Sequence, residues 1–281
     1  MANSFKIVDA FEIASQWKAF VQHSPEATFF HSLAMLEAFT ATPQNYPLAA
    51  ACIDDRGAVR AILSSIQITS AAGLARPFST RNVMFSPPIC DGTPEGYEAL
   101  AALVEWHDGQ ANRRSLFSEI RLHHEPSPQL QDTLEACGYR WFEFSNYLVD
   151  TSRPEAELWN NIGKQTRSSI RRTGRRGVTV VRDETRAGVS AAHRMIRTSL
   201  RRSGIPVVDC QLLHSALELM PTDSLQVRLA LKAGEPLAAS IGVVYQDRYF
   251  AWFGGTLRPR GLAPFAAIVW DEIRWSHRRG L

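Results

Sequence analysis

The sequence predicts an α/β protein, or in a stricter classification α+β, made of two consecutive units. Each unit is expected to be a mixed, largely antiparallel sheet flanked by helices. Helical and strand patterns alternate along all 281 residues, and a hairpin followed by a proline-initiated helix occurs twice. The length suits two units of about 140 residues, which we place at residues 1–150 and 151–281. With 45% hydrophobic and 21% charged residues, the chain can bury a sizeable core.

The first unit is expected to open with a strand at residues 5–8. A helix to about Gln22 follows, because Asp9 with Glu12 three residues later is the pattern of a reciprocal N-cap. A second helix starts after Ser32. Two hairpin strands are expected at 48–53 and 59–69, and a helix at 94–110. A strand at 118–123, a helix at 128–137 and one or two further strands at 139–149 should follow.

The second unit repeats part of this plan. Its hairpin turn at 232–235 corresponds to the turn at 54–57, and the helix after Pro264 corresponds to the helix after Pro94. Counterparts of residues 116–149 are missing, so we expect the second sheet to be truncated. The unit is expected to begin with a helix at 152–173, a strand at 178–182 and two helices at 189–203 and 210–220. Three strands at 225–231, 237–245 and 249–256 and a final helix at 264–279 should follow.

Several classes of protein are excluded by what the sequence lacks. No apolar run approaches the roughly 18 residues that span a bilayer, and the amino terminus is charged where a signal peptide is apolar. A cytoplasmic protein is therefore expected. The four cysteines form no C-x-x-C pair, so neither a disulfide framework nor a metal site is indicated. Signatures of esterases, P-loop proteins and zinc proteases are also absent.

Positive charge is concentrated in one segment. The net charge is only +3, but residues 164–202 contain twelve Lys or Arg against two acidic residues, Asp183 and Glu184, which gives +10 locally. Such a segment indicates an anionic partner, either the phosphate of a small ligand or a nucleic-acid backbone.

Three of these cations share one face of the expected helix at 152–173. At 100° per residue, Lys164, Arg167 and Arg171 fall together, whereas Leu158 and Ile162 lie opposite and are expected to pack. Arginine suits phosphate because it donates two parallel hydrogen bonds and keeps its charge. The alternative is structural, since cations near a helix carboxyl end interact favourably with the helix dipole.

A second candidate binding site is the loop at 258–263, between the last strand and the last helix. It contains Arg258, Arg260 and Gly261 and ends at Ala263. A glycine-containing loop before a helix directs free backbone amides to one point, which can bind pyrophosphate. The alternative is an ordinary connection with two exposed arginines.

Several short elements resemble the Fem-like aminoacyltransferases of peptidoglycan bridge synthesis, a branch of the GNAT acyltransferase superfamily. They are Phe30-His31-Ser32, the stretch from Glu157 through Arg167 to Arg171, residues 201–206, and the final strands leading to Trp270 and Gly280. The resemblance covers nearly the whole chain. It implies two tandem GNAT-like subdomains and a transferase of cell-wall biogenesis, which moves an acyl or aminoacyl group to an amine.

The resemblance also implies partners and site residues. Arg258, Gly261 and Ala263 match the R-x-x-G-x-[GA] pyrophosphate loop of GNAT enzymes, which implies acyl-CoA as donor, with Arg260 beside it. Aminoacyl-tRNA is the alternative donor, although the helical arm of tRNA-using members is absent. The acceptor would be a small molecule or envelope precursor carrying phosphate, held by Lys164, Arg167 and Arg171. No metal is implied.

The strand around Trp252 is the expected centre of the chemistry. In this fold a backbone N–H of residues 252–254 would stabilise the oxyanion, and Trp252 is a candidate for the substrate pocket, although strand aromatics also form sheet cores. Asp271 and Glu272 are candidate bases by charge alone. The general acid and the oligomeric state are left open. The lysine that some members carry after the Phe30-His31-Ser32 element is absent here.

Two other functions compete with an acyltransferase. One is a binding module in which the +10 segment holds a nucleic-acid backbone without chemistry, although residues 164–202 contain no Phe, Tyr or Trp for stacking on bases. The other is an inactive GNAT-like scaffold.

Overall fold

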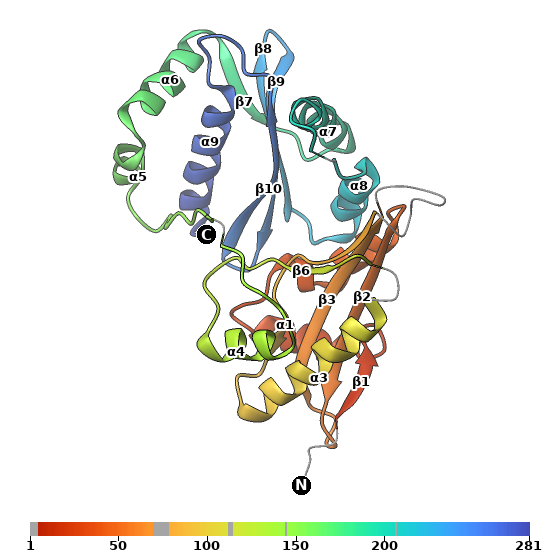
Figure 1. Cartoon of the computed structure of the whole chain (residues 1–281). Coiled ribbons are helices and arrows are strands. Elements are labelled where there is room, and N and C mark those ends of the chain that lie inside the picture. The colour runs from red at the N-terminus through yellow and green to blue at the C-terminus, as the bar shows by residue number, and fades with distance from the viewer. Residues whose placement is uncertain (1–4, 70–78, 112–114, 144, 206) are drawn as a thin grey trace. The chain divides into compact units, whose positions relative to one another are not determined.

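The computed structural model describes residues 5–69, 79–111, 115–143, 145–205 and 207–281. The chain divides into two compact units, Met1–Asn146 and Tyr147–Leu281 (Figure 1). None of the helices in the described ranges combines the length and apolarity that crossing a bilayer requires.

The first unit contains a mixed sheet in the order β1-β2-β3-β4-β6, with the short β5 paired to β3. All pairs are antiparallel except β4 with β6, which is parallel. Its elements are β1 (Lys6–Asp9), α1 (Ala14–His23), the 3-10 helix η1 (Phe29–His31), α2 (Leu33–Thr40), β2 (Asn45–Ile53), β3 (Val59–Thr69), β4 (Thr80–Met84), β5 (Ile89–Cys90), α3 (Pro94–Ala111), β6 (Ser118–Ile120) and α4 (Pro128–Ala136).

Helices α3 and α4 pack on one face of this sheet and form its main hydrophobic core. Small strand side chains such as Ala50, Cys52 and Ala61 allow close approach of the apolar face of α3, with Leu100 and Leu103 fully buried. Burial of such leucines stabilises the unit by about 2 kcal/mol each.

The Phe30-His31-Ser32 element has a local structural role in the first unit. Ser32 caps α2 by accepting a hydrogen bond from the Met35 amide, and the His31 ring accepts one from the Thr28 amide. The other ring nitrogen of His31 donates to the Pro87 carbonyl at 3.0 Å. The fully buried imidazole therefore fixes the chain that precedes α3, and burial lowers its pKa to about 4.

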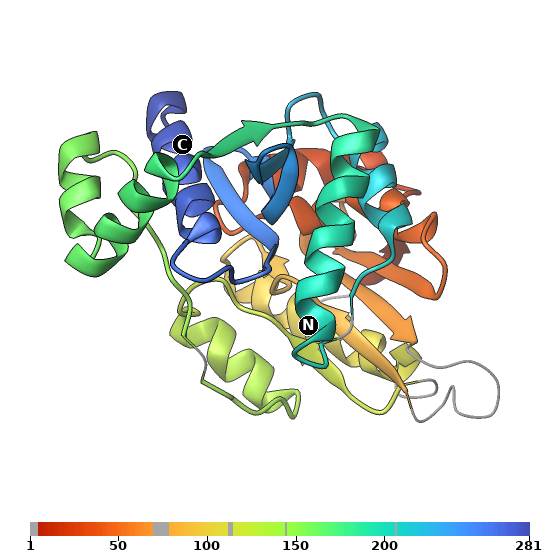
Figure 2. The same ribbon diagram turned by 90° about the horizontal axis from the view of Figure 1, so that it is seen from above.

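The second unit contains an antiparallel sheet in the order β10-β9-β8-β7. Helices α7 and α8 lie on one side of it and α6 and α9 on the other, as Figures 1 and 2 show. Its elements are α5 (Glu155–Asn161), α6 (Lys164–Arg175), β7 (Val178–Arg182), α7 (Arg186–Arg201), α8 (Cys210–Leu219), β8 (Leu225–Lys232), β9 (Glu235–Tyr245), β10 (Arg248–Thr256) and α9 (Pro264–Arg279).

Two glycines of β10 bring the helices onto opposite faces of this sheet. A side chain on Gly254 would collide with the Phe265 ring of α9, and one on Gly255 would collide with the Ile196 backbone of α7. Because neighbouring strand residues face opposite sides, α9 and α7 must cover different faces. Both helices can approach closely only because these residues lack a Cβ.

The structure corrects three of the predicted elements. The helix predicted at 152–173 is two helices, because Ile162 is extended and Gly163 starts α6. Leu158 and Ile162 therefore do not lie on the helix that carries the cations. The first helix begins at Ala14, because Asp9 forms a local turn with the Phe11 amide instead of capping it.

The strand predicted at 139–149 is not formed in the part of this segment that the structure describes, which leaves out residue 144. Its apolar residues are highly exposed, with Phe142 at 89% and Tyr147 at 88%. Alternating apolar residues favour a strand only where a neighbouring strand accepts its hydrogen bonds, and no such neighbour pairs with the described residues of this segment.

Candidate functional site

The two helices that follow the matched hairpins, α3 and α9, differ in how their amino termini are satisfied. The first amides of any helix have no partner within the helix, so they bind a capping side chain, water or an anionic ligand. The capping of these two helices therefore indicates which unit can hold an anionic ligand at this position.

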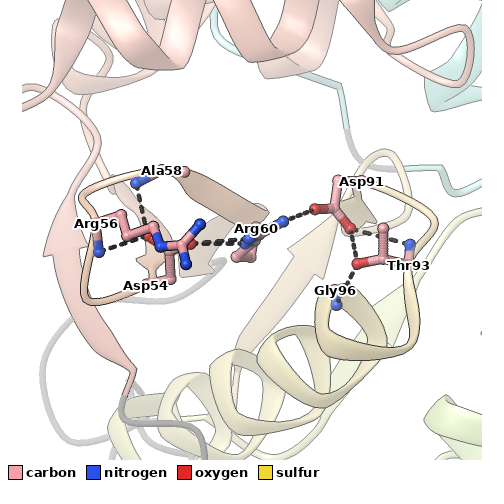
Figure 3. Close-up of polar contacts among 7 residues, drawn as sticks. All are labelled: Asp54, Arg56, Ala58, Arg60, Asp91, Thr93 and Gly96. Carbon is pink, nitrogen blue, oxygen red and sulfur yellow. Dashed lines mark hydrogen bonds and ion pairs between the residues drawn. The ribbon is translucent and has the colours of Figure 1, made fainter.

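In the first unit, the chain's own carboxylate occupies the amino terminus of α3 (Figure 3). Asp91 accepts hydrogen bonds from the amide (3.0 Å) and hydroxyl (2.6 Å) of Thr93, and the Thr93 hydroxyl accepts one from the Gly96 amide at 3.0 Å. Arg60 bridges the Asp91 carboxylate to Asp54, at 2.8 and 2.9 Å. An external anion would have to displace Asp91, so this helix end is already filled.

In the second unit, the amino terminus of α9 has no side-chain cap in the described chain. Ala263 occupies the N-cap position and Pro264 the first helical position, so neither side chain can accept a hydrogen bond from the first turn. The first helical hydrogen bond is the one from the Ala267 amide to the Ala263 carbonyl. The amides of residues 265 and 266 therefore remain available to a ligand.

The loop before α9 presents cations beside these amides. Arg258 and Arg260 are exposed and form no ion pair within the residues that the structure describes. A turn from the Leu262 amide to the Pro259 carbonyl closes the loop, and Gly261 adopts a φ of 69°, which favours glycine. The predicted residues Arg258, Arg260, Gly261 and Ala263 thus lie together in one loop at an uncapped helix end.

This loop is attached to the carboxyl end of α6. The Ala263 amide donates a 2.8 Å hydrogen bond to the hydroxyl of Thr173, which is fully buried and donates in turn to the Ser169 carbonyl. Thr173 could not be singled out from the sequence, because 90 residues separate it from Ala263 and no local pattern connects them.

The three cations Lys164, Arg167 and Arg171 do lie on one helix, α6, but they are not equivalent. Arg167 donates to the carbonyls of Trp159 (3.3 Å) and Asn160 (2.5 Å), where α5 ends. The Arg171 guanidinium lies 5.2 Å from the centre of the Trp159 ring. Lys164 is exposed and forms no ion pair in the described ranges. Arg167 therefore satisfies a helix carboxyl end, the structural alternative raised for these cations.

The whole +10 segment does not form a single surface. Its first part is α6, which packs with α9 on one side of the sheet, and its last part is α7, on the other side (Figures 1 and 2). Two of its arginines are also neutralised, Arg182 by Glu184 and Arg186 by Glu218. Strand β7 separates the two helices, so the charges divide between two faces of the unit.

Strand β10 carries an irregularity at the predicted chemical centre. Its register with β9 shifts between Ala251 and Phe253, so Trp252 is the extra residue of a β-bulge. Trp252 is half-buried, and its ring lies 4.7 Å from the ring of Phe253. Bulges bend a strand and re-aim its backbone groups, and β10 forms one edge of the described sheet.

Comparison with known proteins now adds to this geometry. Residues 161–281 match the family model described as an acetyltransferase (GNAT) domain. The second unit is a GNAT domain. The description of this family names acetyl transfer, so the second unit is an acyltransferase domain. No curated protein matches the chain.

Solved structures extend the likeness to the whole chain. FemX superimposes with a TM-score of 0.66 at 13% identity, covering 99% of this chain and 86% of its own. The C-terminal domain of a putative lysylphosphatidylglycerol synthetase from Agrobacterium fabrum has a TM-score of 0.56 at 14% identity, with 97% and 76% covered. A tandem GNAT protein from the clavulanic acid biosynthesis pathway has 0.53 at 13%, with 99% and 86% covered. The predicted tandem GNAT-like fold is thereby confirmed.

Within the GNAT domain, the two candidate bases belong to a buried network between α9 and the sheet. Arg228, with no exposed surface, donates to Asp271 at 3.0 Å, and the Tyr249 hydroxyl donates to Glu272 at 2.7 Å. Burial raises the pKa of both Tyr249 and Glu272. These contacts identify Asp271 and Glu272 as groups that fix α9 on the sheet.

A Ser-His-Asp arrangement in the first unit is also structural. The two ring nitrogens of His107 lie 2.9 Å from the Ser65 hydroxyl and 2.9 Å from the Asp108 carboxylate, as in a hydrolase triad. Ser65 is 1% exposed and His107 is not exposed at all. A substrate carbonyl cannot reach this hydroxyl, so the arrangement serves the core of the first unit.

The first unit also contains a cavity of about 710 Å³ beside α1 and the start of α3. Within the described part of the chain, its lining includes apolar residues such as Ile89 and Leu100 and the carboxylates of Glu26 and Asp91, but no Lys or Arg. It therefore offers no cation to the phosphorylated ligand expected from the sequence. The described residues contain no group of three or more side chains suited to hold a metal.

Proposed function

We propose that the GNAT domain binds acyl-CoA at the 258–263 loop and transfers its acyl group to an amine of a phosphorylated cell-envelope acceptor in the cytoplasm. The single observation that carries the donor site is the uncapped amino terminus of α9 beside Arg258, Arg260 and Gly261. Backbone amides would bind the pyrophosphate oxygens, and the guanidinium groups would neutralise its charge.

The reaction itself needs few groups from the protein. A neutral amine of the acceptor attacks the thioester carbonyl and forms a C–N bond, and the C–S bond then breaks. The thiolate of CoA leaves and receives the proton that the amine loses. An unperturbed lysine-type amine has a pKa near 10.4, so the site must favour its neutral form.

The tetrahedral intermediate would be stabilised at the bulge of β10. Backbone N–H groups of residues 252–254 are the proposed donors to the oxyanion, because the bulge bends β10 there and β10 forms one edge of the described sheet. Loss of one such donor typically costs about 3 kcal/mol of transition-state stabilisation. We assign the Trp252 ring to the wall of the acyl pocket.

The acceptor assignment rests on two supports. Lys164 and Arg171 present positive charge on α6, while Arg167 holds the end of α5 and would act through helix position. The structural likeness to FemX and to a putative lysylphosphatidylglycerol synthetase favours an acceptor of the cell envelope, such as a peptidoglycan precursor. We therefore propose a phosphorylated envelope precursor with a free amine.

The donor assignment is tested by thiol release from acyl-CoA over a panel of amine acceptors. Arg258→Ala and Arg260→Ala are each expected to raise the KM for acyl-CoA about tenfold or more, as the loss of a charge-assisted hydrogen bond predicts. Arg248→Ala is the matched control, because Arg248 is an exposed arginine at the start of β10, the strand before the loop, and lies next to Asp247. A KM for acyl-CoA that neither loop substitution raises would refute the donor loop.

The same panel distinguishes the competing functions. Transfer from aminoacyl-tRNA without any from acyl-CoA would replace the donor assignment. Absence of turnover with all donors would favour an inactive scaffold. Binding of nucleic acid with steep salt dependence, about one unit of log-log slope per phosphate, would favour the binding module, although the division of the +10 segment between two faces opposes it.

A further inference from the structure

Arg176, which no sequence motif singles out, lies directly against the proposed donor loop. It follows the last residue of α6, and its guanidinium Nη1 lies 2.9 Å from the position that a Cβ on Gly261 would take. The guanidinium therefore lies next to Gly261, whose φ of 69° favours glycine.

The guanidinium of Arg176 is not used by the protein's own groups. Within the described ranges it forms no ion pair and donates no side-chain hydrogen bond, and the residue is exposed. Only its backbone amide is engaged, with carbonyls of the last turn of α6. Arg167 contrasts with it, since the Arg167 guanidinium holds the carbonyls at the end of α5.

The position of Arg176 relative to the loop is fixed by the neighbouring contact. Thr173, three residues earlier, binds the Ala263 amide at 2.8 Å and is fully buried. The carboxyl end of α6 and the amino end of α9 are thereby held together. The backbone that carries Arg176 is therefore held beside the loop before any ligand binds.

We propose that Arg176 is a third cationic ligand of the donor pyrophosphate, together with Arg258 and Arg260. This assignment rests on the proposed donor site and extends it to a residue of the helix that carries Lys164 and Arg171. A pyrophosphate carries at least two negative charges, and Arg can bind phosphate oxygens in a bidentate manner. The guanidinium lies beside Gly261, within the loop that carries Arg258 and Arg260.

The test measures binding of CoA and of 3′-dephospho-CoA by titration calorimetry. Arg176→Ala is expected to weaken both ligands about tenfold or more, since both carry the pyrophosphate. Arg175→Ala is the matched control, because Arg175 is an exposed neighbour in the same turn, and both affinities should stay within twofold of the wild type. Arg176→Lys should restore part of the affinity.

Three results would overturn the assignment. If Arg176→Ala binds both ligands as tightly as the wild type does, Arg176 is not part of the donor site. The proposed donor site is still supported in that case, because the wild type binds both ligands. Weakened binding of CoA but not of 3′-dephospho-CoA would move Arg176 to the 3′-phosphate. A wild-type protein that binds neither ligand would overturn the proposed donor site together with Arg176. A thermal melt of each variant verifies that it is folded.

Discussion

The hydroxyl of Thr173 accepts a hydrogen bond from the backbone amide of Ala263, 90 residues later in the chain. It joins the end of α6 to the start of α9. One helix carries Lys164 and Arg171, and the other begins at the proposed donor loop. At 1.5 Å per residue, Lys164 lies about 13 Å along α6 from this contact, so the two proposed phosphate sites are distinct places on one rigid support.

Replacement of Thr173 by valine should weaken both folding and donor binding. Val keeps the shape but leaves the Ala263 amide without its acceptor in a buried place, which costs about 1–3 kcal/mol of unfolding free energy. Urea unfolding measures the stability and calorimetry the affinity for CoA. Thr173→Ser retains the hydroxyl and should restore most of both quantities. Equal behaviour of the two variants would contradict a role for the hydrogen bond.

Substitution of Arg167 should lower the stability, whereas substitution of Lys164 should raise the KM for the acceptor. Arg167→Ala removes two hydrogen bonds to the end of α5, so we expect a loss of about 1 kcal/mol in unfolding free energy. Lys164→Ala should leave stability within about 0.5 kcal/mol, as is usual for exposed positions, but raise the KM for a phosphorylated acceptor. Steady-state kinetics with phosphorylated and dephosphorylated acceptors checks this. Equal KM changes for both acceptors would contradict a phosphate contact.

The protein should bind one acyl-CoA per chain. Of the two matched helix ends, that of the first unit is filled by Asp91, and that of α9 has no side-chain cap. Calorimetric titration should give a stoichiometry of one, and Asp91→Asn should leave it unchanged, because the amide oxygen still accepts from Thr93. A stoichiometry of two, with one site that survives Arg258→Ala, would show that the first unit also binds donor.

Stability should fall in mild acid because of His31. Burial lowers its pKa from 6.5 to about 4, so the unfolded chain takes up a proton more readily than the folded one. The contribution to stability is complete above pH 6.5 and is lost as the pH falls towards 4, about 3 kcal/mol in all.

Urea unfolding between pH 7.5 and 4.5 measures this loss. His31→Gln, which retains a side-chain hydrogen-bonding group but does not titrate, should show a flatter profile than the wild type. His23→Gln, at an exposed position, is the control and should keep the wild-type profile. A His31→Gln profile as steep as that of the wild type would assign the acid sensitivity to other groups.

Tyr249 should matter for stability because it supplies a donor to the buried carboxyl of Glu272. Tyr249→Phe removes this 2.7 Å hydrogen bond, and we expect a loss of about 1–3 kcal/mol. Tyr245→Phe is the control, at a half-buried tyrosine of the adjacent strand. Because burial raises the pKa of Glu272, the loss should grow as the pH rises and the carboxyl ionises. A loss no larger than that of the control would contradict the role of the pair.

Local sequence chemistry was sufficient for most of the elements and for the loop between β10 and α9. The loop at 258–263 was predictable because its cations, its glycine and the following proline are consecutive, and consecutive residues constrain one another whatever packs around them. The turn at 54–57 and the start of α4 after Ser127 follow from equally local preferences.

Other outcomes depended on contacts that no local pattern encodes. The segment at 139–149 has the alternation of a strand but lacks a paired neighbour, and the helix predicted at 152–173 breaks where Gly163 begins a new one. Arg167 and Arg171 share a face as predicted, yet the end of α5 and the ring of Trp159 decide what they touch.

By itself the sequence determined the fold class, the duplicated plan and the loop that offers cations and amides together, since these follow from the spacing of residues along the chain. Only the tertiary structure decided that Arg60 holds Asp91 at the start of α3 and that Thr173 binds the Ala263 amide at the start of α9. Hydrogen bonds and charges act over a few ångströms of space, and residues 90 positions apart come within that distance only when the chain has folded.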